Sequence, residues 1–364
     1  MQKGREIRAA VCRSFGEPLT IEDVLLAAPQ RGEARIRVEA SAICHSDLSY
    51  ASGHWGGDLP TVFGHEACGI VEEVGAGVAS VGVGQRVVVG LVRSCGTCRR
   101  CLAGEPALCS GSFRLDETSP ISAKDGSPIG QGLRCGAFAE QVVVHVSQAV
   151  PVSDGLPPTS ACLIACGVMT GFGAVVNTAQ VPPGSSVVVI GAGGVGLNAV
   201  QGAAIAGADP LIVIDISDVK LEAARLFGAT DVINATESDP VAGVLALTDG
   251  GADFVITTAG SAEAMEQGLG CARRGGALVV VGMPPGGRLA SFDPGLLAHD
   301  GKRILGSKLG SSRPQELVPQ LVALYASGEL RLDELVTATY PLDRINDAID
   351  AMRAGAAIRN VVVF

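Results

Sequence analysis

The sequence has no excess of positive charge: its 364 residues include 27 Lys and Arg against 37 Asp and Glu, for a net charge of -10. A nucleic-acid-binding surface needs a basic patch that releases counterions from phosphates. No such patch is visible, so we expect no nucleic-acid partner. Charged residues make up only 18% of the chain and hydrophobic residues 47%, a balance that excludes wholesale disorder.

Targeting signals are also missing. The N-terminal stretch "MQKGREIRAAVC" is charged and lacks the apolar core of a signal peptide. We see no run with enough apolar residues to span a bilayer. We therefore expect a cytoplasmic protein with no membrane partner. Because thiols stay reduced in that compartment, the 11 cysteines are interpreted as metal ligands, nucleophiles or buried hydrophobic residues rather than as disulfides.

The length predicts two domains, since a chain of this size exceeds what one hydrophobic core usually organises. Residues 7–150 contain short β-rich runs such as "ARIRVEA" and "AEQVVVHV", typical of an irregular, mostly antiparallel β domain in which we predict no helix. We interpret "ETSPISAKDGSPIGQG" as a long polar loop.

Farther along, apolar runs such as "SSVVVIGAGGVG", "PLIVIDIS" and "GALVVVGMPP" alternate with alanine-rich helical stretches. That alternation indicates an α/β fold with a doubly wound parallel sheet. Two amphipathic helices and the strand "RNVVVF" follow, and we assign them to the first domain. The expected domains are therefore 1–167 with 307–364, and an inserted nucleotide-binding domain at 168–306.

The inserted domain carries a dinucleotide-binding motif. "VVVIGAGGVG" places glycines after an apolar strand and before a helix, in the frame GxGxxG: Gly191, Gly193 and Gly196, with Gly194 between them. These glycines permit a tight turn, let the backbone approach a pyrophosphate and bring helix close to strand. Asp215 ends the next strand, where a carboxylate accepts hydrogen bonds from a ribose diol and selects NAD over NADP. Lys220 lies near the same ribose or is an ordinary solvated lysine.

Two groups of residues suggest metal sites. Four cysteines in "CGTCRRCLAGEPALC" have a spacing that wraps one tetrahedral Zn²⁺ with no open position, a structural site: Cys95, Cys98, Cys101 and Cys109. Arg93, Arg99 and Arg100 flank this cluster and would offset its negative charge. A second group is dispersed, in "AICHSDL", "FGHEACGIV" and "ACGVMTG". Two cysteines and one histidine make a catalytic zinc set, but spacing alone does not join them, and single Cys or His residues are commonly buried filler.

A family resemblance joins the dispersed group. "GHE" followed by "GIVEEVG", the four-cysteine loop and "GAGGVG", in this order, resemble the zinc-dependent medium-chain alcohol dehydrogenases, and the similarity extends to the C-terminal "IRNVVVF". The resemblance implies a GroES-like catalytic domain with an inserted Rossmann domain, two Zn²⁺ per subunit, and NAD. It assigns the catalytic zinc to Cys44, His65 and Cys166, with Glu66 at the same metal site and Glu66 and Asp47 orienting the ligands.

The same resemblance implies roles for residues around the cofactor and the substrate. Thr170, Val195, Gly282 and Met283 match positions near the cofactor, and His45 and Arg359 match positions that hold its pyrophosphate. Ser46 matches a hydroxyl that passes the substrate proton to the nicotinamide ribose. The expected substrate pocket is an apolar slot that takes an uncharged primary or secondary alcohol: Ser46, Trp55, Leu91 and Met283.

The chain departs from the family pattern at Ser49, where many members have a histidine that completes the proton relay. We expect water near Ser49, or His54, to carry the proton out, although His54 also fits an exposed turn-rich loop. Ser46 replaces a bulkier threonine of many members, which favours larger or secondary alcohols.

Three alternative functions remain at this point. A thiol-adduct (S-hydroxymethyl) formaldehyde dehydrogenase would need cationic side chains for the adduct's carboxylates, and Arg114 is the one candidate. A zinc-free quinone reductase would lack the catalytic ligands. A non-catalytic zinc- and nucleotide-binding protein would leave those ligands without a purpose. We also expect a homodimer or homotetramer formed by edge strands at "RILGSKLG".

Overall fold

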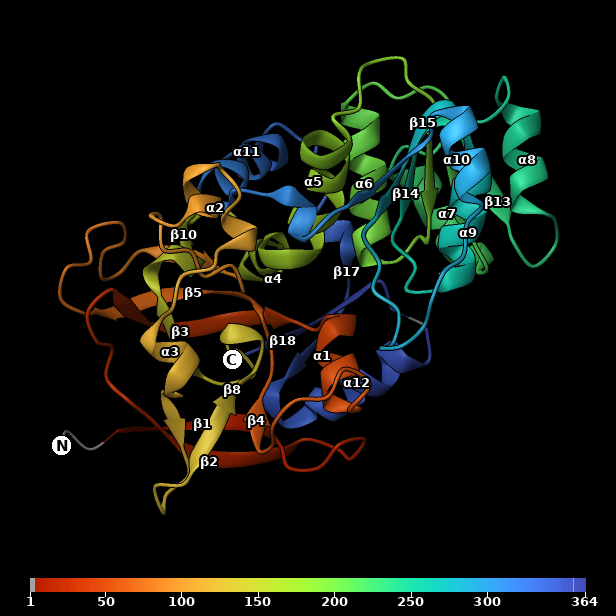
Figure 1. The fold of residues 1–364 in the computed structure, drawn as a ribbon. Coiled ribbons are helices and arrows are strands. Elements are labelled where there is room, and N and C mark those ends of the chain that lie inside the picture. The colour runs from red at the N-terminus through yellow and green to blue at the C-terminus, as the bar shows by residue number, and fades with distance from the viewer. Residues whose placement is uncertain (1–3, 356) are drawn as a thin grey trace. The chain divides into compact units, whose positions relative to one another are not determined.

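The computed structural model describes residues 4–355 and 357–364, and the chain forms two compact units (Figure 1). Unit 1 comprises Met1–Cys166 and Arg313–Phe364, and unit 2 is Gly167–Ser312. The boundaries thus lie at 166/167 and 312/313, whereas the sequence analysis placed them at 167/168 and 306/307. Each unit has its own sheets and its own core of buried aliphatic residues.

Unit 1 contains a closed five-stranded barrel, ordered β1-β2-β7-β8-β4, and a seven-stranded sheet, ordered β10-β6-β5-β3-β18-β17 with β9 paired to β3. Most pairs are antiparallel, as the β-rich runs predict, while β4 pairs with β8 and β17 pairs with β18 in parallel. The strands are β1 Arg5–Cys12, β2 Thr20–Leu26, β3 Glu33–Ala42, β4 Thr61–Val62, β5 Glu66–Val74, β6 Arg86–Val89, β7 Ile121–Ser122, β8 Pro128–Gln131, β9 Gln141–His145, β10 Ala149–Pro151, β17 Val336–Pro341 and β18 Arg359–Val363.

Two expectations for unit 1 were wrong. Its N-terminal part does contain helices, because short helices form where the chain leaves a strand or a cysteine turn: α1 His45–Ala51, α2 Arg99–Leu102, α3 Arg114–Glu117 and α4 Pro158–Leu163. The polar stretch 117–132 is not a loop but contains the antiparallel pair β7–β8, which completes the barrel and buries Ile121 and Ile129. The two amphipathic helices form as predicted, α11 Pro314–Ala326 and α12 Ile345–Arg353.

Unit 2 is a six-stranded, wholly parallel sheet, with helices packed against it (Figure 1). The strand order is β13-β12-β11-β14-β15-β16, so the chain builds the sheet outward in one direction from β11 to β13 and in the other direction from β14 to β16. The carboxyl ends of β11 and β14 therefore border the crevice where doubly wound sheets bind nucleotides. The strands are β11 Val187–Ile190, β12 Leu211–Asp215, β13 Asp231–Asn234, β14 Ala252–Thr257, β15 Ala272–Val280 and β16 Arg303–Gly306; the helices are α5 Met169–Gly173, α6 Gly194–Ile205, α7 Asp218–Leu226, α8 Pro240–Leu247, α9 Ala262–Cys271 and α10 Pro294–Asp300.

One helical stretch, Pro158–Ala179, is long and apolar enough to span a membrane by length and composition, with a mean hydropathy of 1.8 over its most apolar window. The expectation that no run reaches this threshold was therefore wrong. However, 89% of that window is buried within the protein. The segment passes through α4, the π-helical turn Ile164–Val168, α5 and a second π-helical turn, Ala174–Ala179, and is explained by its place in the protein core.

Candidate functional site

Asp47 organises the segments that carry two of the expected zinc ligands. Its side chain is 2% exposed. Asp47 Oδ2 accepts a hydrogen bond from the backbone N–H of Cys44 at 3.0 Å, while Asp47 Oδ1 accepts from the N–H of Gly64 at 2.9 Å and lies 3.0 Å from His65 Nδ1. Gly64 adopts φ +92, and a side chain there would meet the backbone of Phe138. The carboxylate thus fixes the ring of His65 and the start of α1 together.

Four potential ligand atoms converge in unit 1. Cys44 precedes α1, His65 and Glu66 lie where β5 begins, and Cys166 lies in the π-helical turn Ile164–Val168. One ligand atom of each residue lies within 4.8 Å of the others, and all four residues are buried. Zinc bonds of about 2.0–2.3 Å place tetrahedral ligand atoms about 3.5 Å apart, so only small shifts are needed to enclose an ion. Tertiary folding has joined residues that sequence spacing could not.

An unpaired ring nitrogen of His65 supports the presence of a metal ion at this site. His65 Nε2 is buried and has no hydrogen-bond partner among the described residues, because Asp47 engages the other ring nitrogen. A buried polar atom without a partner is costly, and a metal ion placed among the ligand atoms would remove that cost. Two sulfurs and one imidazole are also the donor set expected of a catalytic zinc. These residues therefore fit a zinc ion.

The protonation of this group also matches a metal site. A hydrogen bond from the Cys166 thiol, together with His65, lowers the pKa of Cys44 well below its ordinary value, and the same contact with burial raises the pKa of Cys166. Burial acts to lower the pKa of His65, but Asp47 and Cys166 outweigh it and the pKa lies well above the ordinary value. The group thus holds exchangeable protons that a binding zinc ion displaces.

Glu66 has a partner that the sequence did not reveal. Its Oε2 accepts a hydrogen bond from Arg359 on β18, and both side chains are buried. Burial raises the pKa of Glu66 to about 7, even though Arg359 favours the ionised carboxylate. Glu66 Oε1 and Arg359 Nε have no hydrogen-bond partner among the described residues. The resemblance assigned Arg359 to a pyrophosphate, and the structure places its guanidinium against Glu66.

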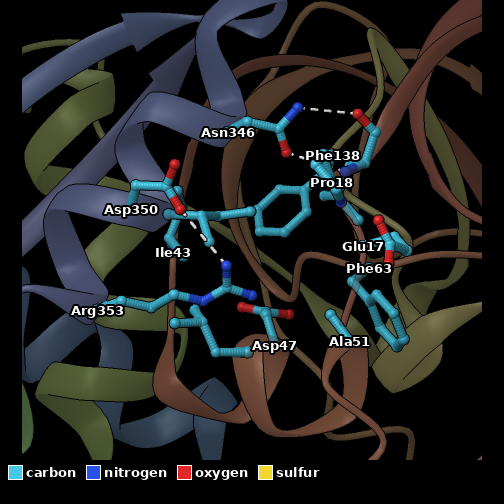
Figure 2. A pocket seen from close by; sticks show the side chains of 13 residues that line it. Glu17, Pro18, Ile43, Asp47, Ala51, Phe63, Phe138, Asn346, Asp350 and Arg353 are labelled. Carbon is cyan, nitrogen blue, oxygen red and sulfur yellow. Dashed lines mark hydrogen bonds and ion pairs between the residues drawn. The ribbon is translucent and has the colours of Figure 1, made fainter. Parts of the chain in front are cut away.

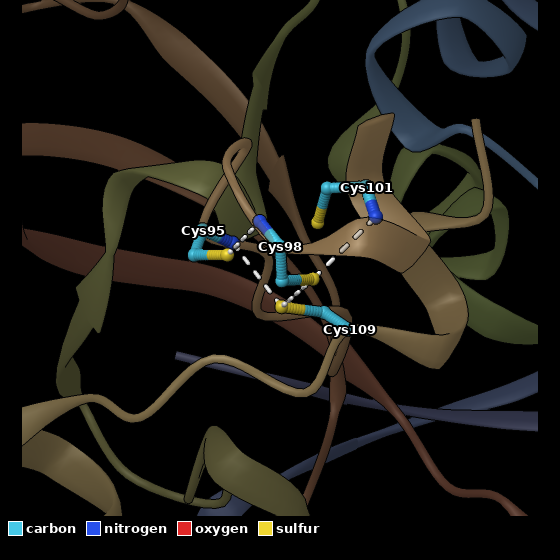
Figure 3. A group of neighbouring side chains, drawn as sticks. All are labelled: Cys95, Cys98, Cys101 and Cys109. Carbon is cyan, nitrogen blue, oxygen red and sulfur yellow. Dashed lines mark hydrogen bonds between the residues drawn. The ribbon is translucent and has the colours of Figure 1, made fainter. Parts of the chain in front are cut away.

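The four-cysteine lobe is the second metal group (Figure 3). Its sulfurs lie within 4.8 Å of one another, with 3.9 Å between Cys98 and Cys109. Backbone N–H groups point at the sulfurs: those of Cys95 and Gly111 donate to Cys109, and that of Cys98 donates to Cys95, each at 3.3 Å. The N–H of Cys101 lowers the pKa of Cys98 to about 5. These four thiolates fit a closed tetrahedral zinc site.

The glycine turn of unit 2 has the geometry of a dinucleotide site. Gly191 adopts φ +96, and a side-chain carbon at Gly196 would lie 1.7 Å from the Gly191 carbonyl oxygen, so both positions require glycine. A side chain at Gly193 would meet nothing within 4 Å, which leaves that backbone open to a phosphate. Asp215 Oδ2 accepts from the N–H of Ala192 at 2.7 Å, so the carboxylate also holds the turn against the end of β12.

The remaining predicted residues differ in exposure. Thr170 is buried in α5. The half-buried ones are Ser46, Ser49, Trp55, Leu91, Val195, Lys220 and Gly282, and the exposed ones are His45, His54 and Met283. Trp55 packs edge-on against Tyr50 at 5.3 Å between ring centroids. Leu91 packs against the aliphatic core of the seven-stranded sheet.

A cavity opens beside α1, but it does not contain the predicted substrate residues (Figure 2). It encloses about 460 Å³, including its open mouth, between α1, α12 and residues 17–19. Phe63 and Phe138 form apolar walls, and Asp350 and Arg353 form an ion pair at its edge, 3.4 Å apart. Neither the ligand residues nor Ser46, Trp55, Leu91 or Met283 line it.

Arg114, the cation considered for a carboxylate-bearing substrate, is already paired. Its guanidinium donates two hydrogen bonds of 2.8 Å to the two carboxylate oxygens of Glu33, which is 3% exposed. The two residues are 81 positions apart, and no sequence signal linked them. A bidentate pair of this kind uses one of the two edges through which a guanidinium binds carboxylates, and it neutralises the charge.

Comparison with known proteins gives consistent matches. Residues 30–154 match the model described as "Alcohol dehydrogenase GroES-like domain", and residues 194–327 match "Zinc-binding dehydrogenase". The chain is 39% identical to "Probable S-(hydroxymethyl)glutathione dehydrogenase 1" of Schizosaccharomyces pombe, over 98% of this chain and 96% of that protein.

Solved structures agree. The structure of an "Alcohol dehydrogenase zinc-binding domain protein" from Burkholderia ambifaria superposes with a TM-score of 0.95 at 34% identity, and that of benzyl alcohol dehydrogenase from Acinetobacter calcoaceticus with 0.93 at 35%. Each match covers 99% of both chains.

Proposed function

Because this chain belongs to the zinc-dependent medium-chain alcohol dehydrogenases, an NAD-dependent family of enzymes, we propose that it oxidises uncharged alcohols, primary or secondary, reversibly to aldehydes or ketones. The observation that carries the proposal is the convergence of Cys44, His65 and Cys166 around an unpaired imidazole nitrogen. Membership of an enzyme family removes the non-catalytic alternative, and the retained ligands argue against a zinc-free quinone reductase.

The residues of unit 1 divide the work of the reaction. Zinc, when bound, supplies a Lewis acid that stabilises negative charge on the substrate oxygen, and NAD accepts the hydride. Cys44, His65 and Cys166 would hold the ion. Asp47 keeps the proton of His65 on Nδ1, which presents Nε2 to the metal. In unit 2, the glycine turn and Asp215 would hold the cofactor, and Thr170 and Val195 would contact its nicotinamide end.

Ser46 takes up the alcohol proton in this proposal. It is the second residue of α1, two positions after Cys44, and it is half-buried. Replacing Ser46 by alanine is expected to lower the rate of alcohol oxidation about 10²-fold and to flatten its pH dependence, because positioned proton transfer typically contributes that much. Pre-steady-state NADH formation across a pH series measures both effects. A Ser49→Ala variant is the matched control for the last step of the relay, in which water near Ser49 carries the proton out. An unchanged pH profile in Ser46→Ala refutes the relay.

The ion pair between Arg114 and Glu33 favours an uncharged substrate. The alternative substrate, a glutathione adduct, carries carboxylates that need cationic partners. Glu33 already occupies the Nε/Nη2 edge of the Arg114 guanidinium. The benzyl alcohol dehydrogenase similarity supports an apolar alcohol as the test substrate. The second candidate keeps its own support, since two relatives are named S-(hydroxymethyl)glutathione dehydrogenases.

A direct comparison of substrates separates the two candidates. We expect kcat/KM for benzyl alcohol and for a secondary alcohol to exceed that for formaldehyde with glutathione by at least about tenfold, a difference of 1.36 kcal/mol in transition-state binding. NADH absorbance, measured with and without a zinc chelator, gives the values. Arg114→Met serves as the control, because it lowers adduct oxidation selectively only if Arg114 binds the adduct. The reverse order of substrates selects the second candidate.

The cellular setting is also part of the proposal. We place the protein in the cytoplasm, since the relatives are dehydrogenases and the cysteines are spaced for metal rather than for disulfides. We propose a homodimer or homotetramer through β16, which is an edge strand of the unit 2 sheet and bears the half-exposed Ile304. Sedimentation velocity of the wild type and of Ile304→Glu measures this assembly, and a monomeric wild type contradicts it.

A further inference from the structure

Arg93 is the largest side chain that unit 1 buries completely, with 1% exposure. Its guanidinium donates from Nε to Gln148 at 2.9 Å and from Nη1 to Asp116 at 2.8 Å. Nη2 donates to the carbonyl of Arg134 at 3.0 Å and, less closely, to the side chain of Gln131 at 3.3 Å. A buried charge is tolerated only when it is paired and hydrogen-bonded in this way.

These contacts lie at the base of the cysteine lobe. Arg93 precedes Cys95 by two residues, and Asp116 lies on α3, seven residues after Cys109. The Arg93–Asp116 ion pair therefore ties the chain that enters the lobe to the chain that leaves it. The ring of Phe113, also on the leaving chain, lies 5.8 Å from the Arg93 guanidinium. Because this ion pair holds the two ends of the loop together, it lowers the entropy cost of closing the loop around a metal.

The other two arginines near the lobe differ from Arg93. Arg99 and Arg100 are exposed on α2, and Arg100 pairs with Glu105 across solvent with side chains 55% and 45% exposed. Exposed pairs are screened and contribute little. From their positions in the sequence, all three arginines were expected to offset the charge of the thiolates. In the structure Arg93 differs from the other two, because its guanidinium is hydrogen-bonded to a carboxylate, two side-chain amides and a backbone carbonyl.

We propose that Arg93 is a positioning residue for the structural zinc. Its ion pair with Asp116 joins the two chain segments at the base of the lobe and so holds the four cysteines in the geometry that retains the ion. The role depends on the forked shape of the guanidinium and not on its charge alone. It concerns the retention of zinc in the lobe and is independent of which alcohol the enzyme oxidises.

The rate of zinc release from the full-length protein tests this role of the Arg93–Asp116 pair. In a His65→Ala background, which leaves only the lobe zinc, release into a chromogenic chelator is expected to be about tenfold faster for Arg93→Met, the scale of effects seen when residues supporting metal ligands are removed. Arg93→Lys is expected to be nearly as fast, because a lysine cannot bond Gln148, Asp116 and Arg134 together. Asp116→Asn is expected to speed release several-fold while keeping the side-chain shape.

Arg100→Met is the matched control, since it removes the same charge from the same lobe and is expected to change the rate less than twofold. The visible spectrum of Co²⁺ bound in the lobe adds a readout of ligand geometry, and it is expected to shift in Arg93→Met but not in Arg100→Met. If Arg93→Met fails to fold, Asp116→Asn decides the outcome. Equal acceleration by Arg100→Met, or unchanged release in Asp116→Asn, overturns the proposal.

Discussion

Replacing His65 by alanine is expected to remove most of the alcohol oxidation activity and one of the two zinc ions. The imidazole nitrogen of His65 that lacks a partner is the ligand atom that we propose for the catalytic ion, and the four-cysteine lobe shares no residue with this group. Charge stabilisation by a bound metal supplies several kcal/mol, so kcat/KM should fall by about 10³- to 10⁴-fold. Metal analysis of the purified variant should find one zinc per chain in place of two, and NADH absorbance should report the rate.

His54→Ala is the control for this experiment. His54 is exposed and lies outside both metal groups, so its loss should leave the zinc content unchanged and the rate within a few-fold of wild type. A large loss of rate in His54→Ala with full zinc content would instead identify His54 as the outer proton carrier. A His65→Ala protein that keeps two zinc ions would remove the assignment of Cys44, His65 and Cys166.

Asp215→Ala is expected to weaken NAD binding and to change the choice of cofactor. The carboxylate ends β12. In the proposed cofactor site it would make two hydrogen bonds to a ribose diol, each charged and worth about 1.5–3 kcal/mol, and the variant would lose both. We expect KM for NAD to rise about 10²-fold and the preference for NAD over NADP to shrink, because the repulsion of a 2′-phosphate disappears as well. Steady-state kinetics with both cofactors at saturating alcohol measures the change.

Asp215 also supports the glycine turn through the N–H of Ala192, so part of the loss in Asp215→Ala could arise from the turn itself. Thermal unfolding of the variant separates the two causes, and KM for the alcohol should stay constant. Asp218→Ala is the control: this aspartate begins α7 three residues later and bonds Asn234 at 2.7 Å, so it removes a nearby negative charge without touching the turn. An unchanged NAD to NADP ratio in Asp215→Ala contradicts the ribose assignment.

The sequence by itself determined the features whose chemistry is local. The glycine turn and the four-cysteine lobe are each made within about 20 residues, and hydrophobic periodicity predicted the parallel sheet of unit 2 and the helices α11 and α12. The short helices α1, α2 and α3 escaped prediction because their four to seven residues are too few for a helical period to appear. The β7–β8 hairpin escaped because its polar strands gain their stability from barrel partners.

Only the tertiary structure decided which distant charges meet. Asp47 with His65, Glu66 with Arg359, Glu33 with Arg114 and Arg93 with Asp116 are pairs separated by 18, 293, 81 and 23 residues. Their sequence neighbours carry no pattern that matches partners, since a single carboxylate or guanidinium looks the same on a solvated surface as in a core. Burial makes the difference: once folding removes water, each such charge must find its partner, and those partners set the metal ligands and the lobe in place.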